Sequence, residues 1–378
     1  MNAAPPPALF LGANTPWVYA LASALSEDRS VAAVAVYDRS NYRRLRPSWP
    51  EGPKAARLER EFWVFLPGYA GRLEPLLRPW FRRRVRGILK RLIRVQADCQ
   101  PWTVVPYPWF GPALGRWSAK RIVYYNLDDY VLYHPARRAR ILAQEADLVA
   151  RARWTLCLSH LQTERLRARL PAHAKRILHF PLGVTEAFLN PAPESPPAAG
   201  TVGYVGNLGD RVDWELVCAV AAAVPQAKFV FVGGLEDGIG SGRRADWLAH
   251  RKAALALPNV RHAGKVAQEA VIPFYWQSAV NWIPYATDHP FNEAACPTKI
   301  MDAIAAGRPV FSTGTPECRL YPEWITVADR AENLAAGLRR ALATAPDAAR
   351  SRRQVDFARG HTWTHRAEEL RRRLADVL

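Results

Sequence analysis

Short runs of apolar, β-branched and aromatic residues alternate along this chain with longer stretches in which the apolar residues recur at helical spacing. The runs in the first half predict strands at Ala8–Leu11, Val31–Val36, Thr103–Pro106, Arg121–Tyr125, Trp154–Leu158 and Arg176–Phe180. Those in the second half predict strands at Thr201–Val205, Lys228–Val232, Val260–His262, Ala279–Ile283, Pro309–Ser312 and Ile325–Ala328, with helices such as Asp213–Val224, Thr298–Ala306 and Ala331–Ala345 between them. This alternation is typical of α/β proteins with parallel sheets. We therefore expect two Rossmann-like, doubly wound domains whose carboxyl edges face a crevice between them.

A proline-rich segment separates the two halves. Residues 189–200 are rich in proline and small residues and have no periodicity, as is typical of an interdomain linker. The length of 378 residues also exceeds the size at which one hydrophobic core usually stops growing. We expect an N-terminal domain over residues 1–190 and a C-terminal domain over residues 191–360.

The segment Leu76–Arg94 combines a helical apolar periodicity with strong positive charge. Eight of its residues are basic and none is acidic. A basic amphipathic helix with aromatic residues near its start suits the surface of an anionic bilayer. The alternative is a helix that packs on its own domain and turns an arginine face to solvent, and the two interpretations are compatible. Nucleic acid is a weaker candidate, since no helix-turn-helix, zinc-finger or RNP-like signature accompanies the segment.

The net charge of +18 is concentrated in the first half of the chain. Residues 1–190 hold 30 Lys and Arg against 14 Asp and Glu, whereas residues 191–378 hold 22 against 20. This asymmetry predicts a polyanionic partner for the first half, such as an anionic membrane surface or a phosphorylated lipid. A general arginine bias is the alternative, but it would enrich both halves.

The composition indicates a soluble globular protein, with 49% hydrophobic and 23% charged residues. The longest apolar runs are too short to cross a bilayer, and the N-terminus lacks the basic and apolar regions of a secretory signal. The five cysteines are scattered without metal-ligand spacing, which favours reduced thiols in a reducing compartment. We therefore expect a cytoplasmic protein with no metal site.

The stretch from Asn292 to Val310 carries the strongest chemical signal. Its pattern predicts a helix that opens at Pro297-Thr298 and ends at Gly307. Lys299 then lies in the first turn, where backbone N–H groups and the helix dipole already attract phosphate. Asp302 follows one turn later on the same face, where a carboxylate can accept hydrogen bonds from ribose hydroxyls. A lysine and an aspartate at this spacing are also common as a solvated ion pair.

The run PTKIMDAIAAGRPVFST resembles the donor-site helix of GT-B glycosyltransferases. The resemblance implies that Lys299 binds the diphosphate of a nucleotide sugar, with Thr298 beside it. It also implies that Asp302 replaces the glutamate that usually binds the ribose. The family often has two glutamates with seven residues between them. Here Glu293 is assigned the first position, although it stands nine residues before Asp302.

Other segments match the same family in order. Gly206 and Asn207 lie in a turn after a strand and resemble the loop that approaches the donor phosphates, with Arg211 placed to bind phosphate. The segment Leu257–Val266 resembles a family motif that places His262 and Val266 near the base. Further matches are the strand ending at Tyr285, assigned to the donor site, and Trp363, in a closing helix over residues 361–378 that is expected to return to the N-terminal domain.

In the first half, Gly12, Asn14 and Trp17 follow the first predicted strand and are candidates for the acceptor side. Asp128 and Asp129 end another strand. They resemble a segment of bacterial polysaccharide glycosyltransferases of the xanthan glucuronosyltransferase type, in which an aspartate serves as the base. One of the two could deprotonate an acceptor hydroxyl while the other caps the next helix, or both could serve only as caps.

The resemblance implies transfer of a sugar from a nucleotide diphosphate donor, with UDP favoured, to a hydroxyl of a lipid-linked or polysaccharide acceptor in bacterial cell-surface glycan synthesis. We expect no cofactor, no metal requirement and no nucleic-acid partner, and a peripheral position on the inner face of the cell membrane. Inverting and retaining courses both stay open. The alternatives are a nucleotide-sugar epimerase or hydrolase on the same fold and a non-catalytic polyanion-binding protein.

Overall fold

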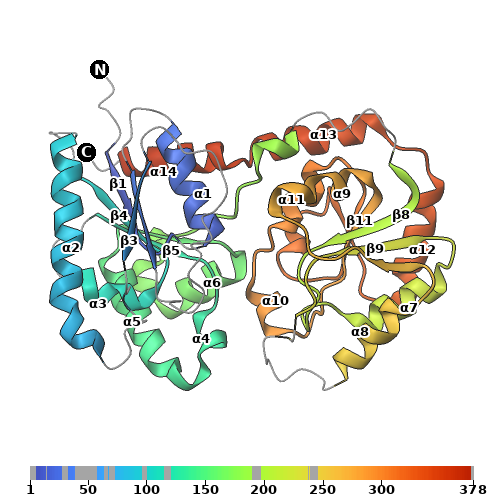
Figure 1. Ribbon diagram of the computed structural model, residues 1–378, viewed down its shortest axis with the longest axis horizontal. Helices are drawn as coiled ribbons and strands as arrows, with labels where there is room; N and C mark the ends of the chain where they lie inside the picture. The colour runs from blue at the N-terminus through green and yellow to red at the C-terminus, as the bar shows by residue number, and fades with distance from the viewer. Residues whose placement is uncertain are drawn as a thin grey trace. The chain divides into compact units, whose positions relative to one another are not determined.

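The computed structural model describes residues 6–13, 15–27, 33–38, 58–63, 67, 73–95, 100–114, 121–189, 197–236, 238 and 246–375. The chain forms two compact units (Figure 1). Unit 1 comprises Met1–Leu182 and Trp363–Leu378, and unit 2 comprises Gly183–Thr362. The proline-rich linker predicted at residues 189–200 lies largely outside the described residues.

The described residues of unit 1 form a parallel sheet of seven strands in the order β3-β2-β1-β4-β5-β6-β7. The strands are β1 (Ala8–Phe10), β2 (Ala33–Asp38), β3 (Leu58–Trp63), β4 (Trp102–Val105), β5 (Ile122–Asn126), β6 (Trp154–Cys157) and β7 (Ile177–His179). The helices are α1 (Pro16–Glu27), α2 (Glu74–Val95), α3 (Gly111–Leu114), α4 (Tyr130–Tyr133), α5 (Arg138–Arg151), α6 (His160–Arg169) and α14 (Trp363–Ala375). The sheet lies between two layers of helices. One layer is made of α1 and α14, and the other is made of α2, α3, α5 and α6.

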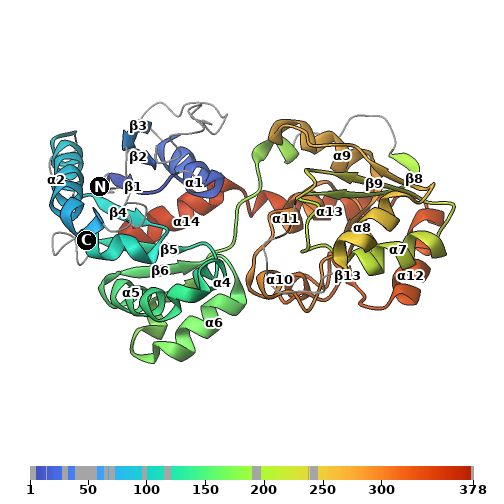
Figure 2. The ribbon, with the colours of Figure 1, turned by 60° about the horizontal axis from the view of Figure 1, so that its bottom comes forward.

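Unit 2 is built on a second parallel sheet, in the order β10-β9-β8-β11-β12-β13. The strands are β8 (Ala198–Val205), β9 (Lys228–Val232), β10 (Val260–His262), β11 (Ser278–Ile283), β12 (Val310–Ser312) and β13 (Ile325–Val327). The helices are α7 (Trp214–Ala223), α8 (Trp247–Leu255), α9 (Ile272–Gln277), α10 (Pro290–Ala294), α11 (Lys299–Ala305), α12 (Ala331–Ala343) and α13 (Ala348–Arg359). Helices α7, α8 and α12 lie together, while α11 packs against α13 (Figure 2).

The two parallel sheets with interspersed helices confirm the predicted fold class. The strand β3 was not predicted, because the sequence Leu-Glu-Arg-Glu-Phe-Trp carries three charged residues. Among the described strands it lies at the edge of the sheet and pairs with β2. Its acidic side chains reach α2, where Arg84 lies 3.3 Å from Glu61. On α1, the ring of Tyr19 lies 5.0 Å from the Arg60 guanidinium. Edge strands tolerate such charges because one of their sides pairs with no strand.

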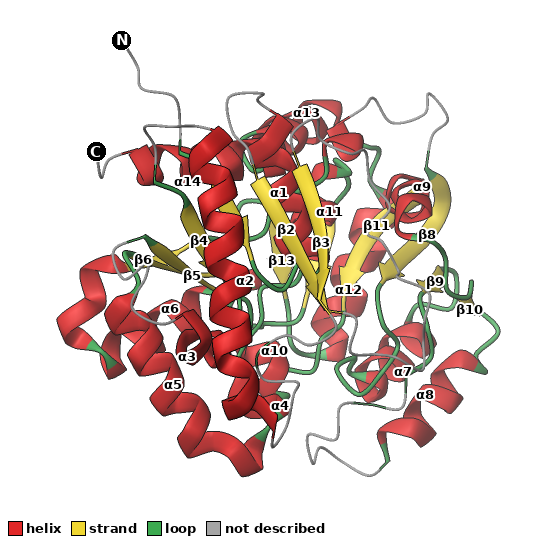
Figure 3. Cartoon of the chain, turned by 60° about the vertical axis from the view of Figure 1, so that its left-hand side comes forward, coloured by secondary structure: helices red, strands yellow, loops and turns green. Residues whose placement is uncertain are grey.

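Helix α2 corresponds to the basic segment Leu76–Arg94 and is shown along its whole length in Figure 3. Its apolar side packs into the core of unit 1 through the buried residues Phe81, Val85, Ile88, Leu89 and Leu92. The opposite side exposes Arg82, Arg83, Arg84, Arg86, Lys90, Arg91 and Arg94. The helix therefore packs on its own domain and keeps a basic face in solvent. This arrangement leaves that face able to meet an anionic surface, so both interpretations of the sequence are compatible with it.

Candidate functional site

The loops at the carboxyl edge of the unit 2 sheet are held together by backbone hydrogen bonds. The Gly206 amide, after β8, donates to the Val232 carbonyl at 2.9 Å. The Gly233 amide, after β9, donates to the Gly264 carbonyl at 2.9 Å. This edge of a doubly wound sheet is where such folds bind ligands.

Lys299 is the first residue of α11 and thus lies in its first turn, as predicted, and it reaches the Gly206 loop. A Cβ on Gly206, which has φ of +149°, would lie 2.9 Å from Cε and 3.0 Å from Nζ of Lys299. A side chain at residue 206 would therefore occupy the space that the lysine uses. The lysine Nζ donates a hydrogen bond of 2.5 Å to the Tyr285 hydroxyl and lies 5.6 Å from the centre of the Tyr204 ring.

Two cations flank the phenol of Tyr285. Lys299 Nζ lies 4.8 Å from the centre of the Tyr285 ring and the Arg211 guanidinium 5.2 Å from it. Burial alone would raise the pKa of Tyr285, but the positive charges of Lys299 and Arg211 outweigh it and lower this pKa below its ordinary value. Positive potential is thus concentrated beside the glycine loop, as a diphosphate site requires.

Asp302 lies on α11 one turn after Lys299 and is half-buried. Burial raises the pKa of its carboxyl to about 7, and the Lys299 ammonium opposes part of that shift. The predicted cation and carboxylate are therefore electrostatically coupled on one helix face. Their spacing suits a diphosphate and the ribose attached to it.

Two polar pairs clamp the Gly206 loop to the segment after β11. Arg211 Nε donates to Asn292 Oδ1 at 2.7 Å, and Asn292 Nδ2 returns a hydrogen bond of 2.8 Å to the Arg211 carbonyl. Nearby, His289 Nε2 lies 3.4 Å from Asp210 Oδ2, and both side chains are buried. Asp210, His289 and Asn292 were not predicted as site residues, because each of these pairs joins two loops that lie far apart in the sequence.

The other predicted donor residues lie at or near the same sheet edge. His262, at the end of β10, has Nε2 2.8 Å from the Gly233 carbonyl oxygen. The Asn207 carbonyl accepts a hydrogen bond of 3.1 Å from the Tyr204 hydroxyl. Val266 is half-buried beyond β10, Thr298 precedes α11, and Glu293 is exposed on α10.

The two aspartates of unit 1 have different surroundings at the end of β5. Asp129 caps α4, because its carboxylate accepts a hydrogen bond of 3.1 Å from the Val131 amide. Asp128 accepts from the Asp129 amide at 2.8 Å and from the Tyr133 hydroxyl at 2.7 Å. The carboxylate of Asp129 thus serves as a helix cap. The carboxylate of Asp128 instead binds the hydroxyl of Tyr133, a side chain that is 44% exposed.

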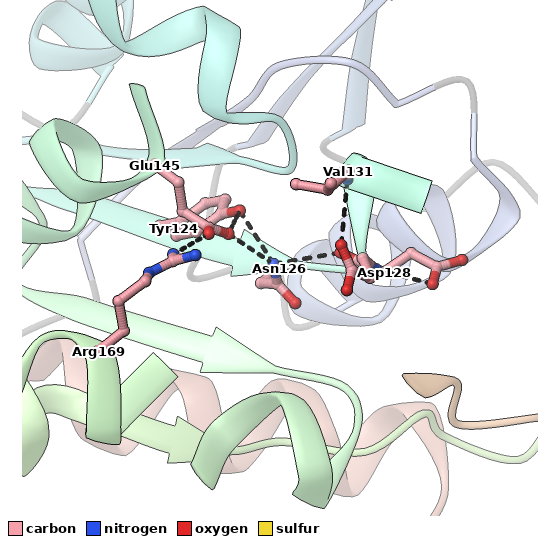
Figure 4. Close-up of polar contacts among 7 residues, drawn as sticks. Tyr124, Asn126, Asp128, Val131, Glu145 and Arg169 are labelled. Carbon is pink, nitrogen blue, oxygen red and sulfur yellow. Dashed lines mark hydrogen bonds and ion pairs between the residues drawn. The ribbon is translucent and has the colours of Figure 1, made fainter. Parts of the chain in front are cut away.

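A buried network supports this strand end (Figure 4). The Glu145 carboxylate accepts from the Tyr124 hydroxyl at 2.8 Å and from Asn126 Nδ2 at 3.1 Å, and it is ion-paired with Arg169. The same Asn126 nitrogen lies 3.4 Å from the Asp128 carbonyl oxygen. The network fixes the backbone that carries the two aspartates.

On the predicted acceptor side, Gly12 follows β1 with φ of +66°. Trp17 lies half-buried in the first turn of α1, and Asn14 lies outside the described residues. Among the described residues, no group of three His, Cys, Asp or Glu could hold a metal ion. The helices in the described part of the chain include none long and apolar enough to span a membrane.

A family model described as glycosyl transferase-like matches residues 211–372. Bacillus subtilis TuaH, assigned to teichuronic acid biosynthesis as a glycosyltransferase, is 23% identical over 256 residues. That match covers 63% of this chain and 62% of TuaH. The chain therefore spans less than two thirds of this relative.

Solved structures match over nearly the whole chain. The Anabaena HepE structure in complex with UDP has a TM-score of 0.69 at 14% identity, covering 98% of this chain and 100% of that one. A Rickettsia africae glycosyltransferase has a TM-score of 0.65 at 10% identity, covering 98% and 99%. These likenesses confirm the fold, and with the family match they confirm the predicted resemblance to GT-B glycosyltransferases.

Proposed function

We propose that this chain, with its GT-B fold and its glycosyl transferase-like second unit, transfers a sugar from a UDP-sugar to an acceptor hydroxyl in bacterial cell-surface glycan synthesis. The observation that carries the proposal is Lys299 at the start of α11, against the side-chain-free Gly206. The matched relative assigned to teichuronic acid biosynthesis and the similar structure with bound UDP support it. The acceptor is a polysaccharide or a lipid-linked molecule, including one linked through a lipid diphosphate.

In this proposal Lys299, Arg211 and the backbone around Gly206 bind the diphosphate, while Asp302 accepts hydrogen bonds from the ribose. The bond from the sugar carbon to the diphosphate oxygen breaks as the acceptor oxygen bonds to that carbon. Negative charge grows on the leaving diphosphate, so the fixed cations stabilise the transition state more than the bound donor. We propose that they replace a divalent metal. Asp128 takes the acceptor proton if the sugar is inverted.

The first test measures thermal unfolding with UDP, GDP, ADP and CMP. UDP at about a hundred times its Kd should add about 2.7 kcal/mol to the unfolding free energy, and the shift should persist in EDTA. Absence of stabilisation by all four nucleotides would contradict the donor site. Binding to polyanions alone, with a steep salt dependence, would instead favour a polyanion-binding protein. Turnover of the donor without any acceptor would favour an epimerase or hydrolase.

The pKa of Asp302 makes donor binding pH-dependent. Only the ionised carboxylate offers all its lone pairs to two ribose hydroxyls, and its pKa of about 7 means that acid removes this form. Affinity for UDP-glucose should therefore rise by at most about tenfold from about pH 6 to about pH 8, as measured by titration calorimetry. Asp302→Asn should abolish this slope and Asp302→Glu should keep one. If the affinity of Asp302→Asn for UDP-glucose depended on pH as that of the wild type does, a group other than Asp302 would be responsible.

We also propose that α2 holds the enzyme on the inner face of the cell membrane. Near its start Leu76 is 76% exposed and Trp80 is 40% exposed, beside the row of exposed arginines, and Leu73, just before the helix, is 58% exposed. An interfacial helix needs apolar side chains that enter the headgroup region and cations that attract anionic lipids, and α2 has both.

Binding to vesicles tests this surface. The protein should sediment with vesicles containing phosphatidylglycerol and remain in solution with phosphatidylcholine alone. Replacing both Arg83 and Lys90 by Glu should weaken the binding about 30-fold or more, since each cation near an anionic surface contributes to the attraction. The matched control replaces the exposed Arg352 and Arg353 of α13 by Glu. An equal loss in this control would contradict attachment through α2.

A further inference from the structure

An aromatic segment at the carboxyl end of β4 has no part in the proposed donor site. Residues 106–110 read Pro-Tyr-Pro-Trp-Phe, and Pro108–Phe110 forms a short 3-10 helix. Phe110 is buried, whereas Tyr107 and Trp109 are half-buried. The rings of Tyr107 and Trp109 stack with their centres 4.9 Å apart and their planes 6° from parallel. The chain thus holds two large, half-buried rings stacked one on the other.

The stack is tied to the loop that carries the aspartates. The Tyr130 ring centre lies 5.5 Å from that of Tyr107 and 5.4 Å from that of Trp109. Its hydroxyl accepts a hydrogen bond of 3.2 Å from the Leu127 amide and donates to the Pro106 carbonyl. Tyr130 is buried, so it acts as a rigid support. The stack therefore has a defined position relative to Asp128.

The end of β1 closes on the same cluster. A Cβ at Gly12 would lie 3.0 Å from a ring carbon of Phe110 and 3.1 Å from one of Tyr107. The loops after β1, β4 and β5 thus meet around one group of aromatic rings. The ring centre of His134 also lies 6.1 Å from that of Trp109. The exposed Tyr133 donates to Asp128.

Partly exposed aromatic rings beside a carboxylate match the chemistry of a sugar ring. One face of a pyranose presents C–H groups that pack against the negative face of an aromatic ring. Its edge presents hydroxyls that donate to a carboxylate. A bare lipid alcohol offers the hydroxyl without such a face.

We propose that Tyr107 and Trp109, with Asp128, form a subsite for a pyranose ring, the terminal residue of the acceptor. This inference rests on the proposed function and deepens it, because it makes the acceptor hydroxyl a sugar hydroxyl. In this arrangement the aromatic stack holds the ring face and Asp128 accepts from the hydroxyl that reacts.

The experiment measures saturation-transfer NMR on methyl pyranosides of glucose, galactose, mannose and N-acetylglucosamine, with sorbitol as an acyclic polyol. The wild type should saturate the ring protons of at least one pyranoside and none of those of sorbitol. Trp109→Ala should weaken that binding about fivefold, whereas Trp109→Phe should keep most of it. Trp154→Ala is the matched control and should bind as the wild type does, because this half-buried tryptophan lies at the start of β6, away from the loops after β4 and β5.

Circular dichroism and the melting temperature establish that each variant is folded. Absence of transfer to every pyranoside in the wild type, or equal transfer in folded Trp109→Ala, would overturn the subsite. Stabilisation by UDP reports the donor site separately. If the wild type fails to bind UDP but binds a pyranoside, and Trp109→Ala loses that binding, the result would support this subsite and contradict the proposed transfer reaction.

Discussion

Lys299→Ala should lower kcat/KM by about 150-fold, equivalent to about 3 kcal/mol of transition-state stabilisation. The ammonium lies at the start of α11 against Gly206, where negative charge would collect as the diphosphate leaves. The pKa of Tyr285 should also rise in this variant, because the positive charge of Lys299 lowers this pKa more than that of Arg211 does. The measurement is steady-state kinetics with the UDP-sugar and acceptor found by product analysis.

The controls separate the role of the charge from that of folding. Lys299→Arg keeps a cation and should lose less activity than Lys299→Ala. Lys252→Ala removes an exposed lysine from α8 in the same unit and should have wild-type kinetics. Activity of Lys299→Ala within threefold of the wild type would refute diphosphate binding by this residue.

Asp128→Asn should lower kcat by about a hundredfold or more, while Asp129→Asn should stay close to the wild type. Asparagine cannot take the acceptor proton at residue 128. At residue 129 it still caps α4, because asparagine and aspartate are equally good caps. The two changes remove the same charge from adjacent positions, so each is the control for the other.

The split between kcat and KM should distinguish this loss from simple misplacement of the acceptor. Asp128→Asn should lower kcat while its KM for the acceptor stays near that of the wild type. Equal losses in the two variants would contradict a base at Asp128. Unchanged turnover in Asp128→Asn would leave Asp128 only a positioning role, as a retaining mechanism requires.

The local sequence determined most of the secondary structure. Runs of β-branched residues with turn signals and apolar residues at helical spacing are short-range patterns, so they predicted parallel sheets and both α2 and α11. The cation and carboxylate of α11 were also predictable, because their relation depends on one helical turn and one helix end. The basic and apolar sides of α2 follow from the same periodicity.

Only the tertiary structure placed the distant partners. Arg211 and Asn292 are 81 residues apart, and their pairing depends on how the loops after β8 and β11 meet at the sheet edge. The charges of β3 argue against a strand until α2 and α1 supply their partners. The stack of Tyr107 and Trp109 acquires its position from Tyr130, on another loop. Sequence periodicity specifies which face of an element is apolar, whereas side-chain packing between elements decides which polar and aromatic groups meet.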